Sequence, residues 1–136
     1  MHASVIVPPA VLRELRAGLE AGVHVPEMSI FPWARSIGPK SLAVLPAIID
    51  LGSGESEVLA VGLENPGSLL IIDDRLARRV GAAIGLRFTG TLGVLLKAKQ
   101  SGLLPSVGKA ISQLRDAGLW LNDDLIASVL TLAGEP

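Results

Sequence analysis

The chain contains no cysteine and no tyrosine, and only 3% of its 136 residues are aromatic. Without cysteine there is no disulfide framework and no thiolate for metal or redox chemistry. His2 and His24 are too few and too far apart in the sequence for a histidine-based zinc motif. The scarcity of aromatic side chains also argues against a nucleic-acid surface built from stacking platforms. Thiol chemistry is therefore excluded and a zinc site is disfavoured.

Long hydrophobic runs are also missing, because the apolar stretches are short and broken by glycine, proline or charge. The first residues, "MHASVIVPP", lack the basic start and long apolar core of a signal peptide. The overall content of 49% apolar and 18% charged residues is typical of a globular fold, and the length fits one domain over residues 1–136. We expect a soluble, cytoplasmic protein that has no membrane partner.

Acidic and basic residues are segregated in the central sequence: one segment lacks positive charge and the next lacks negative charge. Between Asp50 and Asp74 there are six acidic residues and no lysine or arginine, whereas between Arg75 and Arg115 there are eight basic residues and no acid. A carboxylate-rich segment that leads directly into a basic one is suited to holding a divalent cation and attracting a polyanion. Two solvated faces of opposite sign are the simpler alternative.

Strand and helix patterns alternate along the chain. "SVIV" and "SLLIID" predict strands, each followed by a helix, and "LRFTG" predicts a further strand. Three helices then follow in "TLGVLLKAKQ", "PSVGKAISQLRDA" and "NDDLIASVLTLA", whereas "SIFPWARSI" and "SLAVLPAIIDL" are predicted only as short extended segments. Buried strands between helices predict an α/β fold with a mainly parallel sheet covered on both faces. Both tryptophans, Trp33 and Trp120, are predicted to be packing residues.

The acidic pair Asp73 and Asp74 directly follows a predicted strand. In parallel sheets, ligands bind just beyond the carboxyl ends of the strands. One of the two is expected to cap the next helix, and adjacent residues that leave a strand point in roughly opposite directions. Only one of Glu55 and Glu57 is likewise expected to face the site, because residues two apart on a helix do not share a face. A phosphoacceptor receiver domain and a Rossmann-type site are weaker alternatives, since a second strand-end Asp and a GxGxxG motif are missing.

Four motifs together resemble a known family. They are the Gly-Glu-x-Glu helix opening at residues 54–57, the Asp-Asp-Arg at residues 73–75, "TGTLGVLL" and the "GLLPSV" turn. From about Val5 to its end, the chain is similar to PIN-domain-like proteins of bacteria and archaea related to toxin-antitoxin ribonucleases. The resemblance implies a three-layer α/β/α fold with a helical C-terminus, in which carboxylates bind Mg²⁺ or Mn²⁺ for phosphodiester hydrolysis.

When the family's motifs are matched to this sequence, the resemblance implies Glu57 and Asp74 as the preferred catalytic and metal-binding residues. Glu55 and Asp73 are the alternatives if the register differs, with Asp73 expected to cap the helix, and Glu14 is a further acidic candidate. RNA phosphates are then expected to meet the basic helix residues Arg75, Arg78 and Arg79.

The chain also departs from this family pattern. Members begin with an additional strand that ends in Asp, whereas this sequence starts near their second strand and has no carboxylate before Glu14. We therefore expect an N-terminally truncated PIN-like fold that forms a homo-oligomer, a dimer in the simplest case, and has weak or no ribonuclease activity. The alternative is a non-catalytic interaction module that forms a homodimer or binds an antitoxin protein.

Overall fold

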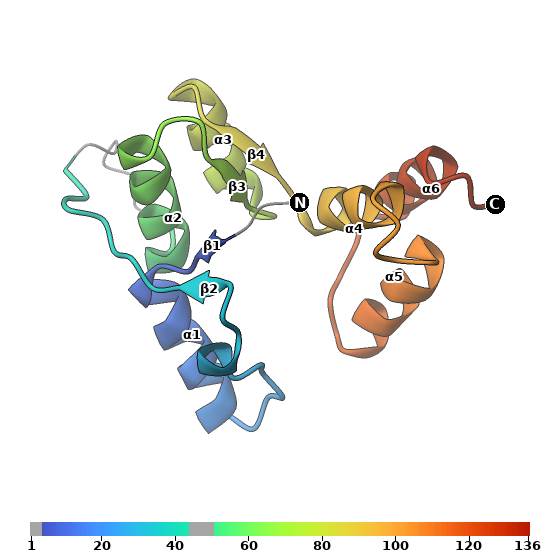
Figure 1. The fold of residues 1–136 in the computed structure, drawn as a ribbon, viewed down its shortest axis with the longest axis horizontal. Helices are drawn as coiled ribbons and strands as arrows, with labels where there is room; N and C mark the ends of the chain where they lie inside the picture. The colour runs from blue at the N-terminus through green and yellow to red at the C-terminus, as the bar shows by residue number, and fades with distance from the viewer. Residues whose placement is uncertain (1–3, 44–50) are drawn as a thin grey trace. The chain divides into compact units, whose positions relative to one another are not determined.

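The computed structural model describes residues 4–43 and 51–136, and its fold divides into two compact units, His2–Phe88 and Thr89–Pro136. Figure 1 shows the helices and strands in chain order. The first unit contains β1 (Val5–Ile6), α1 (Pro9–Glu20), the short 3-10 helix η1 (Met28–Ile30), β2 (Ala34–Arg35), α2 (Ser53–Glu64), β3 (Leu69–Ile71), α3 (Arg75–Ala83) and most of β4 (Arg87–Thr89). The second unit contains α4 (Thr91–Gln100), α5 (Val107–Asp116) and α6 (Asp123–Leu132).

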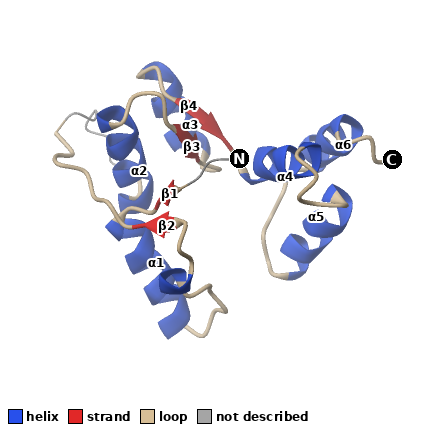
Figure 2. Ribbon diagram, viewed as in Figure 1, coloured by secondary structure: helices blue, strands red, loops and turns tan. Residues whose placement is uncertain are grey.

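The strands form two pairs (Figure 2). β1 runs parallel to β2, with Val5 opposite Ala34 and Ile6 opposite Arg35, and β3 pairs with β4. The two pairs do not join into one sheet within residues 4–43 and 51–136. Parallel pairing and helices after the strands confirm the predicted mixed α/β class, whereas most of the predicted segment "SLAVLPAIIDL" lies outside the described residues.

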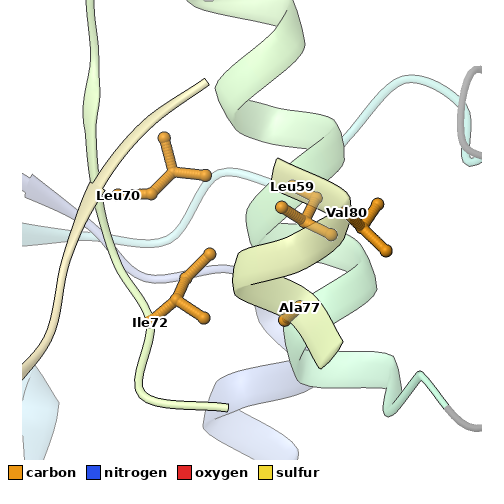
Figure 3. Close-up of a cluster of buried hydrophobic side chains, with 5 residues drawn as sticks. All are labelled: Leu59, Leu70, Ile72, Ala77 and Val80. Carbon is orange, nitrogen blue, oxygen red and sulfur yellow. The ribbon is translucent and has the colours of Figure 1, made fainter. Parts of the chain in front are cut away.

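Helix α2 carries the core of the first unit. Its Leu59 is fully buried against Leu70 and Ile72, at and just after β3, and against Ala77 and Val80 of α3 (Figure 3). Gly62 lets α2 approach β3 closely, because a Cβ at this position would lie 2.8 Å from a methyl group of Leu70. The small residue therefore sets the distance between helix and strand in this core.

The second unit has a separate core made by its three helices. Val107 and Ile111 of α5 and Ile126 of α6 are buried, with Leu92 and Leu95 of α4 packed against them. The ends of these helices carry local capping residues: Asn122 caps α6 through its side chain, and Gly118 follows α5 with a φ of 100°. Local capping residues thus mark the start of α6 and the end of α5.

Glu135 ties the end of the chain to helices α4 and α5. Its carboxylate accepts hydrogen bonds from Lys99 Nζ at 2.6 Å and from the backbone N–H groups of Val107 and Gly108 at 2.7 and 2.9 Å. The Lys99 bond and these two amides at the start of α5 lower the pKa of Glu135 to about 2. A negative charge on Glu135 therefore stabilises the second unit.

This contact predicts an acid-labile second unit. Since the folded-state pKa lies below the ordinary value of 4.5, the stabilisation is present above about pH 4.5 and is lost as the pH falls toward 2. Thermal melts recorded by circular dichroism between pH 7 and pH 2 should show a smaller acid-induced fall in Tm for Glu135→Gln than for the unchanged protein. Glu20→Gln, at an exposed position of α1, is the matched control. Identical pH profiles for all three proteins would contradict the assignment.

Candidate functional site

Four of the five predicted carboxylates surround one hollow in the first unit. The hollow has a volume of about 190 Å³ and lies between α1, the start of α2 and the end of β3. Its acidic lining is formed by Glu14, Glu55, Asp73 and Asp74, and its remaining lining by Val11, Gly54, Val58, Ile71 and Ile72. Residues from three distant parts of the sequence therefore come together as an oxygen-rich surface.

Asp74, and not Asp73, caps helix α3. Its Oδ2 accepts a hydrogen bond from the backbone N–H of Ala77 at 2.9 Å. The prediction that Asp73 provides this cap is wrong, because α3 begins at Arg75 and the residue directly before it is Asp74. Asp73 is exposed and lines the same hollow. Both carboxylates thus stay at the site, with Asp74 oriented by the helix that it caps.

Glu14 connects α1 to the beginning of α2. Its Oε1 accepts a hydrogen bond from the N–H of Gly54 at 3.0 Å, which satisfies a donor that the helix itself leaves unpaired. A Cβ at position 54 would lie 2.5 Å from that oxygen, so glycine is required for this approach. Glu55 follows in the first turn of α2, where a carboxylate complements the helix dipole.

Glu57, on α2, makes the corresponding contact with the start of α1. It is only 8% exposed, and its two carboxylate oxygens lie 3.1 and 3.3 Å from the backbone N of Ala10, which donates to both. Pro9, the first residue of α1, has no N–H, so Ala10 offers the first free donor of the helix. Arg13 lies 3.6 Å from the same carboxylate. The two helices therefore cap each other, and Glu57 is not among the residues that line the hollow.

The donor set fits a hard divalent cation, since carboxylate oxygens are preferred by Mg²⁺ and Mn²⁺. In residues 4–43 and 51–136, however, no three acidic or histidine side chains lie close enough together to enclose a metal ion. Mg²⁺ commonly binds proteins through one or two carboxylates and keeps several waters, so the hollow satisfies that simpler requirement.

The predicted basic residues lie on α3, directly after Asp74. Arg75 and Arg79 are exposed. Arg78 is half-buried, with the centre of its guanidinium 5.1 Å from the centroid of the Phe88 ring, a cation–π geometry. The helix that begins directly after the hollow residue Asp74 thus carries two exposed cations and a third that packing holds in place.

A comparison with family models gives a match to the PIN domain over residues 1–135. The chain belongs to the PIN-domain family, a class of nuclease-like proteins that generally use divalent metal ions. The match spans both compact units, and no curated protein or solved structure matches. None of the described helices is both long and apolar enough to cross a lipid bilayer.

The mutual capping by Glu14 and Glu57 is what the sequence did not reveal. The donor and acceptor residues are 40 and 47 positions apart, so no local pattern connects them. The one usable signal is the Pro8-Pro9 pair at a helix start, which leaves few backbone donors and draws attention to Ala10.

Proposed function

We propose that the chain is a metal-dependent ribonuclease of the PIN type, as related toxin ribonucleases are, and that its metal site is the acidic hollow. The observation that carries the proposal is that Glu14, Glu55, Asp73 and Asp74 line one hollow next to a basic helix. A bound Mg²⁺ or Mn²⁺ would supply Lewis-acid activation of water and of the phosphodiester. The carboxylates around the hollow would hold that ion in place.

Charge supports an RNA substrate for this site. Arg75 and Arg79 are exposed on the helix that Asp74 caps, and a negatively charged backbone needs such cations to approach a cluster of carboxylates. Arg78 is held over Phe88 and adds positive charge to the same helix. We assign these three arginines to phosphate contacts and the acidic hollow to the metal.

Metal binding tests the site directly. Asp74→Asn is expected to weaken Mn²⁺ binding about tenfold and more than Asp73→Asn does, because the Ala77 hydrogen bond fixes the Asp74 carboxylate in place. Asn is itself a good helix cap, so the Asp74→Asn protein should remain folded. Calorimetric titration with Mn²⁺ measures both affinities, with Asp116→Asn at an exposed position of α5 as the control. Equal losses would contradict the preference for Asp74, and a larger loss for Asp73→Asn would make Asp73 the preferred ligand.

The second candidate is a non-catalytic interaction module, either a homodimer or the partner of an antitoxin. It is favoured by the observation that, within the described residues, no three carboxylates lie close enough together to enclose a metal ion. An RNA cleavage assay separates the two candidate functions. Single-stranded RNA is incubated with the protein and Mg²⁺ or Mn²⁺, and Asp74→Asn is the control for contaminating nuclease. Cleavage that requires metal and disappears in the variant supports the enzyme. RNA left intact, together with a dimer in light scattering, supports the module.

A further inference from the structure

The turn between α5 and α6 presents an exposed tryptophan. Trp120 is 82% exposed, the largest value among the exposed large apolar residues described. The sequence-based prediction that Trp120 packs inside the protein is therefore wrong. Indole has a large apolar surface, which water solvates poorly, and tryptophan is enriched among the residues that dominate binding at protein interfaces.

The exposure of Trp120 does not come from a loose connection. On one side the N–H of Leu119 donates to the carbonyl oxygen of Leu114 at 3.0 Å, which closes the end of α5. On the other side Leu121 packs against the core of the second unit, and Asn122 caps α6. Both flanks of the turn are therefore fixed, and the fold holds the indole out toward solvent.

A hollow of about 680 Å³ adjoins this side chain. It is lined by Arg115, Gly118, Leu119, Trp120, Leu121, Asn122, Asp123 and Asp124. Arg115, the only cation among the described residues of the lining, is paired with Asp123. Asp124 therefore gives the lining a net negative charge. Leu125, 55% exposed, extends the apolar part next to it. We call residues 119–125 the Trp120 surface.

We infer that the Trp120 surface binds a segment of a partner protein that combines apolar side chains with lysine or arginine. The apolar side chains would cover the indole and Leu125, and the cations would face the net negative charge that Asp124 gives to the lining. RNA is a poor fit, because the net negative charge of the lining repels phosphate. A symmetric dimer through this surface is disfavoured as well, since it would bring together two surfaces that each carry a net negative charge.

Fluorescence of Trp120 provides the test. The chain has two tryptophans, so Trp33→Phe leaves Trp120 as the only indole. The full chain with this substitution is titrated with a 16-residue helical peptide of leucine and lysine. Two further peptides replace lysine by glutamate, or leucine by serine. We expect a saturable blue shift with the first peptide and at least about tenfold weaker binding of the other two.

Variants then locate the contact, with binding of the labelled leucine-lysine peptide followed by anisotropy. Trp120→Ala and the double change Asp123→Asn with Asp124→Asn should each weaken binding at least about tenfold, and the double change should also reduce its salt dependence. Leu103→Ser, at a 66% exposed position of the second unit, should bind as the unchanged protein does. Circular dichroism confirms that each variant is folded.

Three results would overturn the inference. They are equal binding of the glutamate peptide, an unchanged affinity of the folded Trp120→Ala protein, and a blue shift that grows with protein concentration in the absence of peptide. The last of these would identify self-association as the use of the surface. None of them affects the proposed metal site, which is built from residues of the other unit.

Discussion

Reversing the charges of Arg75, Arg78 and Arg79 to glutamate is expected to weaken binding of single-stranded RNA on the order of 100-fold at low salt. If each arginine neutralises one phosphate, removing the three contacts lowers the slope of log affinity against log salt concentration by about 2. The reversed charges would also repel the RNA backbone, and this repulsion adds to the loss. Filter binding or anisotropy across a series of salt concentrations measures the affinity and the slope together.

The matched control reverses three other exposed cations of the same unit, Arg16, Arg35 and Lys40. This variant has the same net charge as the first, so a specific effect of α3 appears as a difference between the two. Because Arg78 packs over Phe88, a double reversal of Arg75 and Arg79 alone is needed to separate RNA contacts from any loss of packing. An unchanged salt slope in both α3 variants would mean that this basic helix is only a solvated face.

Replacing Glu57 by alanine is expected to destabilise the protein by about 2 kcal/mol, roughly a 30-fold change in the ratio of folded to unfolded chains. The reason is that Ala10, only 1% exposed, would keep its N–H group buried without the carboxylate that now accepts from it. Urea denaturation measures the change. Glu57→Gln, which keeps an acceptor oxygen, should lose less stability, and Glu20→Ala at an exposed position of α1 should lose little.

The glutamine variant also tests the ligand role predicted for Glu57. It removes the negative charge but keeps the oxygen that accepts from Ala10, so stability and metal affinity can be compared in one protein. Weaker Mn²⁺ binding by a stable Glu57→Gln protein would identify a ligand. Unchanged Mn²⁺ binding together with a lower stability of Glu57→Ala would identify a residue whose role is to hold α1 against α2.

Helix positions could be predicted well from the sequence because their signals are local. Asn122 and Gly118 mark helix ends through bonds within a few residues, and β3 was recognisable from its apolar run. The orientation of α2 was not predictable, because its buried residues lie on more than one side and leave no polar stripe. The role of Glu57 depends on a contact with a residue 47 positions away. That contact follows from tertiary packing alone.

Only part of the candidate site could be predicted from the sequence, because its geometry also depends on tertiary packing. The motifs placed Glu57 and Asp74 at one site, with Glu55, Asp73 and Glu14 as further candidates. All of these except Glu57 line one hollow. Which aspartate caps α3 depended on the residue at which the helix begins, and a shift of one position exchanges the two roles. Trp120 was assigned to the core on residue type alone, whereas two fixed flanks hold it outward.

The mutual capping of α1 and α2 gives the first unit a built-in reporter of its opening. Amide hydrogens at the first turn of a helix usually exchange rapidly with solvent, because the helix provides them with no acceptor. Those of Ala10 and Gly54 are instead bound by carboxylates of the opposite helix. Their exchange therefore requires the two helices to separate. Deuterium uptake at these two amides should report the free energy of that separation in the unmodified protein.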